Sequence, residues 1–369
     1  MEKHIVIKEL IGVARCGEPV RVGVPFAKGE LYGVEKLALL NFEGLSIPFQ
    51  AEILGRWKDE SVKWALFDFF ATVPASADTY FTLVHGENCF ADSSEIRITP
   101  GKDLWRIDTG EAQFQVDARE YRPFAKVTIG GRDVLSTTGG HCQLRIEGDY
   151  TLPTVVERID VETPGPLHAI LRVSGFFGKG KFSPHFCSRL HFYAGKSLVL
   201  LEFTIHNLRP AMHPGGLWDL GDPGSFLFKE LVLEFNFTDD YAKNLFLSTE
   251  EGNETVCTPN PTECLLVYQE SSGGENWRSP NHRNRNGEVP FSLCGYEVRN
   301  GEKQLFTGLR ANPIIWCGSG EKGLSAFLPN FWQEFPKAME ANLNFMKVSL
   351  FPGHFPDLHE LQGGEQKTH

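Results

Sequence analysis

Apolar and polar residues alternate in short segments along most of the chain, and glycine, asparagine, aspartate or proline separates the segments. Alternation places every second side chain on one face of a strand, so the pattern predicts β-strands with one buried face. The clearest examples are Ser61–Phe70, Leu198–His206 and Phe226–Phe237, the last with Lys229 in register with its apolar face. The pattern therefore predicts an all-β protein.

Helix signals are scarce, and only Phe335–Met346 is expected to hold a helical turn or two. The 29 phenylalanines suit strands that pack between two sheets. A polar, turn-rich stretch at 86–102 predicts a domain boundary. Residues 270–290 form the longest polar loop, a kind of segment that often carries function. The end, 363–369, resembles a connector that precedes a further strand.

Length, composition and charge limit the domain organisation and the kinds of molecule that the protein can bind. The length of 369 residues and an apolar content of 41% fit a two-domain globular chain. A formal net charge of -11 argues against nucleic acid, and an acidic ligand would need a local basic patch. No apolar run approaches the roughly 20 residues of a membrane span. Oligomeric state cannot be read from the sequence.

The first residues, MEKHIVIKEL, predict a strand and lack the apolar stretch of a secretion signal. We therefore expect a cytoplasmic protein, or a secreted one whose leader has been removed. The eight cysteines include no Cys-x-x-Cys pair, and we expect most of them to be reduced core residues.

Several stretches resemble the rhamnogalacturonan exolyase family (PcRGLX/YetA-like). The segment Ile47–Gln50 with Gly55–Trp64 is similar to a signature of the RIFT-type barrel that opens such proteins. The loop His213–Ser225 resembles a loop of their central β-sandwich. Two further stretches, Phe331–Lys337 and His359–His369, together resemble the end of that sandwich.

The resemblance implies a RIFT-type β-barrel at 1–95 and a large antiparallel β-sandwich at 96–369. Such proteins continue into an α/α toroid, for which no helices are visible here. It also implies a lyase that acts on rhamnogalacturonan, the alternating rhamnose–galacturonate backbone of pectin. Within the barrel signature, we expect Trp57 and Trp64 to pack the barrel rather than to bind sugar.

Cleavage of a galacturonate glycosidic bond by β-elimination needs a base beside the carboxylate carbon and a cationic group that neutralises the carboxylate. Arginine suits the second role, because its fork matches a carboxylate. The candidate catalytic residues are His213, Arg189 and His191. Arg189 and His191 share one strand face, and the structural alternative is a polar outer face of the sandwich.

The loop that contains His213 also carries Trp218, Asp219 and Asp222, which are candidate substrate-binding residues. Trp218 offers an indole ring for stacking on a sugar. The structural alternative is a rigid corner in which Asp219 and Asp222 cap turns.

A second loop supplies Trp277, Arg278 and His282 within a run that has three arginines, which is the basic patch that an acidic saccharide needs. The alternative is a solvated mobile loop. Lys367 is a further candidate for substrate binding, near the end of the chain. If the two loops face each other, a carboxylate-binding cleft follows.

No metal site is indicated, because the chain has no His-Glu-x-x-His motif and no Cys/His quartet. A calcium ion between Asp219 and Asp222 is a minor alternative, and the cofactor stays undetermined. Two other functions remain open: a carbohydrate-binding or domain-organising module without catalysis, and a glycoside hydrolase on the same scaffold.

Overall fold

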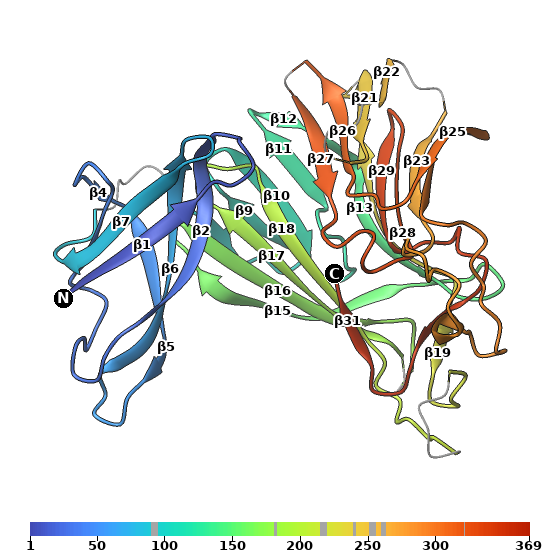
Figure 1. Ribbon diagram of the computed structural model, residues 1–369, viewed down its shortest axis with the longest axis horizontal. Helices are drawn as coiled ribbons and strands as arrows, with labels where there is room; N and C mark the ends of the chain where they lie inside the picture. The colour runs from blue at the N-terminus through green and yellow to red at the C-terminus, as the bar shows by residue number, and fades with distance from the viewer. Residues whose placement is uncertain are drawn as a thin grey trace.

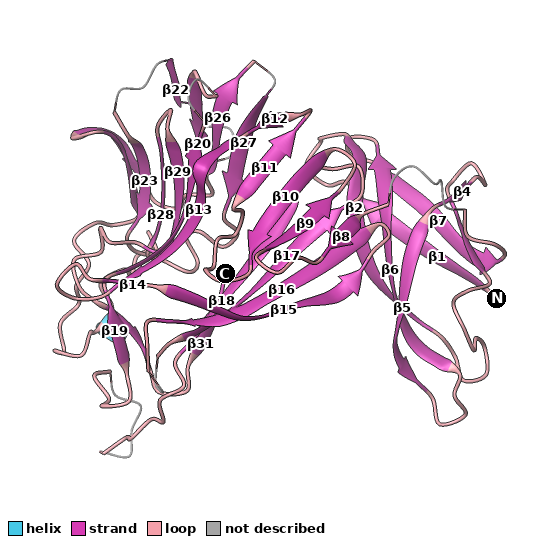
Figure 2. Ribbon diagram, turned by 180° about the vertical axis from the view of Figure 1, so that it is seen from behind, coloured by secondary structure: helices cyan, strands magenta, loops and turns pink. Residues whose placement is uncertain are grey.

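The structure is a computed structural model that describes residues 1–89, 95–180, 183–214, 220–238, 241–250, 256–259, 263–320 and 322–369. These residues form 31 strands and one turn of 3-10 helix, η1 (Pro280–His282), with no α-helix among them. Every strand pairing in the described residues is antiparallel. The all-β prediction is confirmed (Figures 1 and 2).

Two small sheets form the N-terminal barrel, at the left of Figure 1. The first sheet has the order β1 (Glu2–Lys8), β7 (Asp78–His85), β3 (Leu37–Leu40), β4 (Ser46–Ile47). The second has the order β2 (Arg15–Pro25), β6 (Val62–Val73), β5 (Phe49–Arg56). The inward side chains of both sheets share one apolar core, which runs from Ile5 to Leu83.

The two tryptophans of the barrel signature differ in environment. Trp57 is half-buried, and its indole Nε1 donates a hydrogen bond to the carbonyl of Phe26 at 3.1 Å. Trp64 is 43% exposed, so the prediction that it packs the barrel core is wrong. It follows Lys63 on β6, and Ala65, not Trp64, points inward at this level of the strand.

The remaining strands build the larger β-sandwich region. One sheet has the order β15 (Thr154–Pro164), β16 (His168–Phe177), β17 (His185–Tyr193), β18 (Val199–His206), β31 (Gln366–Thr368). The largest sheet has the order β14 (Thr151–Leu152), β13 (Leu135–Arg145), β20 (Glu230–Phe237), β29 (Phe345–Phe351), β28 (Lys337–Ala341), β23 (Leu265–Gln269), β24 (Tyr296–Asn300), β25 (Lys303–Gly308).

Three smaller sheets complete this region. The first has the order β12 (Arg132–Asp133), β11 (Lys126–Ile129), β10 (Ala112–Asp117), β9 (Leu104–Asp108), β8 (Arg97–Thr99). The second has the order β22 (Val256–Pro259), β21 (Asn244–Ser248), β26 (Ile314–Ser319), β27 (Lys322–Phe327). The third is the pair β19 (Phe226–Phe228) and β30 (His359–Leu361).

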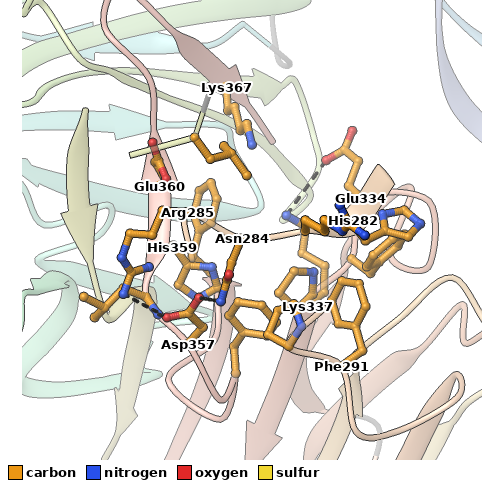
Figure 3. Close-up of a pocket in the computed structure, with 18 of the residues that line it drawn as sticks. His282, Asn284, Arg285, Phe291, Glu334, Lys337, Asp357, His359, Glu360 and Lys367 are labelled. Atoms are coloured by element: carbon orange, nitrogen blue, oxygen red, sulfur yellow. Dashed lines mark hydrogen bonds and ion pairs between the residues drawn. The ribbon is translucent and has the colours of Figure 1, made fainter. Parts of the chain in front are cut away.

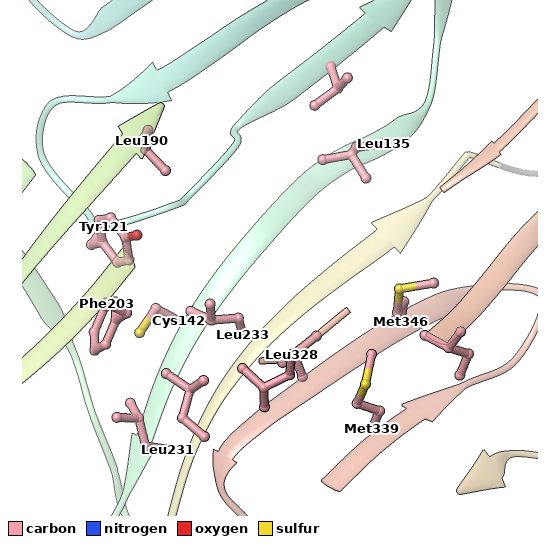
Figure 4. Close-up of a cluster of buried hydrophobic side chains, with 14 of the residues drawn as sticks. Tyr121, Leu135, Cys142, Leu190, Phe203, Leu231, Leu233, Leu328, Met339 and Met346 are labelled. Atoms are coloured by element: carbon pink, nitrogen blue, oxygen red, sulfur yellow. The ribbon is translucent and has the colours of Figure 1, made fainter. Parts of the chain in front are cut away.

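A second apolar core lies between the facing sheets of the sandwich (Figure 4). Leu190 and Phe203 come from β17 and β18, and Leu231 and Leu233 face them from β20. The buried Tyr121 joins them, and its hydroxyl donates a 2.6 Å hydrogen bond to Ser188 Oγ.

We expect Phe203→Ala to lower the free energy of unfolding by about 3–5 kcal/mol, because it opens a cavity at a fully buried aromatic site. Phe203 contacts the rings of Tyr121 and Phe186, with centroids 5.6 and 6.0 Å away. Chemical unfolding measures the loss. The matched control is Leu200→Ala on the same strand, where the side chain is 44% exposed and we expect a loss below about 1 kcal/mol. Equal losses in the two variants would contradict the assignment of Phe203 to the core.

Polar contacts join the barrel to the sandwich. The side chain of Gln50 accepts hydrogen bonds from the backbone N–H groups of Leu167 and His168, both at 3.1 Å, and donates one to the carbonyl of His168 at 3.0 Å. Asp68 of β6 contacts Nδ1 of the same histidine at 3.1 Å. Gln50 belongs to the barrel signature, so one role of that motif is to hold the two parts together.

Two predictions about the C-terminal segments are wrong. Phe335–Met346 holds no helix among its described residues but the hairpin of β28 and β29, because the Asn342 side chain accepts hydrogen bonds from the backbone N–H groups of Asn344 and Phe345 and closes a turn. The segment 363–369 is not only a connector. It contains β31, which pairs with β18 and brings the end of the chain to the middle of the molecule (Figure 1).

Candidate functional site

A pocket of about 530 Å³ lies where five segments distant in sequence meet (Figure 3). These are the loop between β18 and β19, the loop between β23 and β24, the residues that lead into β28, the turn between β29 and β30, and the C-terminal segment with β31. The side chains that the argument uses are His282, Arg283, Arg285, Phe291, Glu334, Lys337, Asp357, His359, Lys367 and His369.

One part of the pocket wall is aromatic. The rings of Phe291, Phe335 and His282 meet edge to face with centroids 5.5–5.6 Å apart, and Phe355 lies 5.9 Å from Phe291. Such rings offer apolar faces of the kind that stack on the C–H groups of a sugar. The loop that carries His282 and Phe291 is long and polar in sequence, yet these two side chains fold back against the sandwich.

The opposite part of the wall is cationic. Arg285 Nη2 lies 3.1 Å from Asp357 Oδ1, and the Asn284 amide donates to the other oxygen of that carboxylate at 2.7 Å. Burial opposes ionisation of Asp357, but the amide of Leu358, Asn284 and the Arg285 charge together lower its pKa. Within the described residues, Arg283 forms no ion pair. Arg283 is therefore a cation that is open to an anionic ligand.

A buried lysine lies at the base of the pocket. Lys337 Nζ donates to the carbonyl of Leu350 at 2.8 Å and lies 3.0 Å from Nδ1 of His369. The Glu334 carboxylate is 4.0 Å from Nζ. Burial lowers the pKa of Lys337 to about 7, repulsion from Lys367 adds to this, and Glu334 opposes it. Near neutral pH this lysine is therefore divided between its charged and neutral forms.

Two pocket histidines remain neutral. Burial lowers the pKa of His369 to about 3, and the charges of Lys337 and Lys367 contribute. Burial also lowers the pKa of His359 to about 3, although its Nε2 has a 3.0 Å contact with the Pro352 carbonyl that acts in the opposite direction. Within the described residues, His369 Nε2 is buried without a hydrogen-bond partner.

The predicted loop 213–225 reaches the edge of this pocket through Leu220, which lines it. Gly221 has a φ of +81°, and a Cβ added there would lie 3.0 Å from Arg285 Cβ, so glycine lets the two loops approach closely. The N–H of Gly221 and the hydroxyl of Ser225 both donate to Glu360 Oε1 at 2.6 Å. The structure thus brings the two predicted loops together.

Asp222 is buried and serves the loop itself. It accepts backbone hydrogen bonds from Met212, His213 and Gly224 at 2.6–3.1 Å. Burial opposes ionisation, but these amides and the nearby His213 lower the pKa of Asp222. His213 Nδ1 lies 3.7 Å from Asp222 Oδ2, and His213 does not line the pocket. Trp218 and Asp219 lie outside the described residues. The alternative of a calcium ion between Asp219 and Asp222 therefore involves one residue that the structure does not describe.

Arg189 and His191 lie away from the pocket. Arg189 is paired with Glu162, with Nε 2.6 Å from a carboxylate oxygen. His191 Nδ1 lies 3.0 Å from Nε2 of His168 at the barrel–sandwich contact. His191 pairs with Leu200 near the start of β18, whereas His213 lies beyond the other end of that strand, and Leu200 and His206 are about 20 Å apart along it at roughly 3.3 Å per residue. The structure therefore does not bring the three candidate catalytic residues together.

Of the basic loop, His282 lines the pocket and Trp277 and Arg278 do not. The Arg278 guanidinium instead stacks on Trp277, with its carbon 4.3 Å from the ring centroid. Lys367 lines the pocket, with Nζ 3.5 Å from Glu365 and 5.8 Å from the centre of the Phe351 ring. The predicted set thus contributes His282 and Lys367 to this site.

Sequence reasoning missed Lys337 and Asp357 as pocket residues. Lys337 is followed by a short apolar segment with no turn signal, and nothing in that pattern indicates that it faces β31. For His369, the sequence signal is its spacing of two from Lys367, because alternate residues of a strand point to the same face.

The part of the chain that the structure describes also bears on metal binding, cysteine location and membrane-spanning helices. There, no group of three or more His, Cys, Asp or Glu side chains is arranged to hold a metal ion. Seven cysteines of this part are free thiols, and two of these seven, Cys142 and Cys317, are buried, so the expected core location holds for those two. No described helix has the length and apolar content that crossing a bilayer requires.

Comparison with known proteins identifies the N-terminal domain and one distant relative of the chain. Residues 11–81 match the PcRGLX-like N-terminal RIFT barrel domain. The chain is 25% identical over 375 residues to the uncharacterized protein YetA of Bacillus subtilis (strain 168), a match that covers 90% of this chain and 42% of YetA. The chain thus spans about two-fifths of the length of this curated relative. It carries a PcRGLX-like RIFT barrel and is a distant homologue of YetA, and the predicted resemblance is confirmed at that level.

Proposed function

We propose that the pocket binds a galacturonate residue of an acidic saccharide, and that the protein is a rhamnogalacturonan lyase-like protein that acts by β-elimination. The observation that carries the proposal is the pairing of a cationic wall with an aromatic wall in one 530 Å³ pocket of a chain whose net charge is -11. Four basic side chains line the pocket, Arg283, Arg285, Lys337 and Lys367, against three carboxylates, Glu334, Asp357 and Glu360. A local excess of positive charge in an acidic protein favours anions at that place.

The chemistry of each wall fits a uronate. Arg283 and the donors that Arg285 leaves free next to Asp357 match a carboxylate, because guanidinium groups bind carboxylates through parallel hydrogen bonds. Phe291 and Phe335 offer apolar surface for the ring carbons of the sugar. The orientation follows, with the carboxylate toward the arginines and the ring toward the aromatic wall.

In the proposed reaction a base removes the proton on C5 of galacturonate, beside the carboxylate carbon. The electron pair moves toward the carboxylate, where the arginines stabilise the added charge. The pair then forms the C4–C5 double bond as the C4–O bond breaks, and the departing oxygen takes up a proton. His282 and Lys367 line the pocket as groups able to hold or transfer these protons.

Mixing the protein with rhamnogalacturonan oligosaccharides tests the proposal. We expect a rise in the ultraviolet absorbance of an unsaturated uronate, together with saturable binding. Binding without the absorbance rise would replace the lyase by a carbohydrate-binding module. Release of reducing sugar without unsaturation would replace it by a glycoside hydrolase, and an absence of binding would remove the saccharide site altogether.

A further inference from the structure

The Lys337 ammonium has only a weak counter-charge. Its two nearest polar contacts are uncharged groups, the Leu350 carbonyl at 2.8 Å and Nδ1 of His369 at 3.0 Å, and that ring nitrogen also lies 3.1 Å from Glu334 Oε2. The nearest carboxylate, Glu334, is 4.0 Å away and its side chain is 40% exposed, so water screens its charge. Burial without a full counter-charge disfavours the protonated amine.

The remaining groups around Lys337 do not supply the missing negative charge. Lys367 on β31 repels it. His359 on β30 and His369, which follows β31, are neutral near pH 7, because burial lowers the pKa of each to about 3. The Phe351 ring of β29, with its centre 5.2 Å from Nζ, gives only a weak cation–π contact.

We propose that the binding of a uronate in this pocket is coupled to the uptake of one proton by Lys337, so that acidic saccharides bind more tightly at mildly acidic than at mildly alkaline pH. The inference rests on the proposed function, since it requires that the pocket bind a uronate. The carboxylate of the ligand adds a second negative charge to the weak one that Glu334 provides. It acts through space across the pocket, and direct contact with the buried amine is not needed.

The linkage follows from the states of the lysine. With a pKa of about 7 in the free protein, Lys337 is largely neutral at pH 8. A bound carboxylate raises that pKa, so the neutral amine takes a proton from the buffer and becomes an ammonium. Between the two pKa values, the association constant then falls by up to about tenfold for each pH unit. Below pH 6 the lysine is already protonated, and the coupling disappears.

Isothermal titration calorimetry with methyl galactosiduronate tests this, since that monosaccharide contains no glycosidic bond at C4 to eliminate. The titration is run in HEPES and in Tris at pH 8, and in MES and in bis-Tris at pH 5.5, so that each pair of buffers differs in heat of ionisation and the difference in heat counts protons. We expect uptake of more than about half a proton per ligand at pH 8 and close to none at pH 5.5. Methyl galactoside, the neutral counterpart, should show no uptake at either pH.

The variant Lys337→Met should bind the uronate with no proton uptake at pH 8. Equal heats in the two buffers for the wild-type protein would overturn the coupling and leave the saccharide site intact. Proton uptake that persists in Lys337→Met would assign the proton to another group and would equally overturn the proposed coupling to Lys337. Failure of the wild-type protein to bind the uronate at any pH would instead remove the proposed function. The wild-type comparison stands even if the variant does not fold.

Discussion

Replacing Arg283 by serine is expected to weaken binding of methyl galactosiduronate by about tenfold, because it removes a charge-assisted hydrogen bond to the carboxylate. Arg283 is the cleanest probe of the cationic wall. It lines the pocket and forms no ion pair within the described residues, so its removal leaves no protein carboxylate uncompensated. The dissociation constant, measured by calorimetry at low salt, gives the effect.

The matched control is Arg278→Ser in the same loop. Arg278 stacks on Trp277 outside the pocket, so we expect its loss to change the dissociation constant by less than about twofold. Equal weakening in both variants would mean that the loop attracts uronates through its general charge. No weakening in Arg283→Ser would place the ligand elsewhere. Arg285→Ser is a less clean test, because it also releases Asp357.

The second large effect is a pH-dependent stability difference between the wild-type protein and Lys337→Met. Lys337 has a pKa of about 7 in the folded protein and about 10.4 when unfolded. Between these values the unfolded chain binds the extra proton, so wild-type stability rises with pH by up to about 1.4 kcal/mol per unit. The destabilisation that the buried lysine causes reaches its full size below pH 7 and vanishes above about pH 10. Methionine has no such titration.

We therefore expect the wild-type protein to gain about 2–3 kcal/mol relative to Lys337→Met between pH 7 and pH 9 in denaturant unfolding. Lys303→Met is the control. That lysine is exposed on β25, at the edge of the same sheet, and forms no ion pair among the described residues. Its stability difference should not change with pH. A flat difference for Lys337→Met would show that the lysine is charged and well compensated in the folded protein.

The two experiments examine the pocket from different sides. Arg283 reports whether the cationic wall recognises a carboxylate, and Lys337 reports how far the base of the pocket is removed from water. Both are independent of the reaction that follows binding. A pocket that passes both tests has the features that β-elimination at a uronate requires, namely a neutralising cation and a group whose pKa is near the working pH.

Strand prediction succeeded where alternation and burial agree. Leu198–His206 is realised as β18, and Phe226–Phe237 as β19 and β20, with a break at Lys229. The break places the Lys229 amine on the carbonyl of Phe355 at 2.5 Å. Prediction failed at Phe335–Met346, because the pairings of β28 with β23 and β29 outweigh a weak local helix preference.

The amino-acid pattern alone determined the all-β class and the two loops that meet at the pocket, because these depend on local periodicity and turn residues. The barrel was identified from the sequence by the resemblance of its motif to a known family. The contact of the basic loop with Leu220 and Gly221, and the position of Lys337 against His369, were decided by the tertiary structure. Strand pairing joins residues as distant as Thr204 and Thr368, and a one-dimensional pattern carries no register between such segments. The same pairing leaves Arg189 and His213 apart, although both lie in segments that favoured a site.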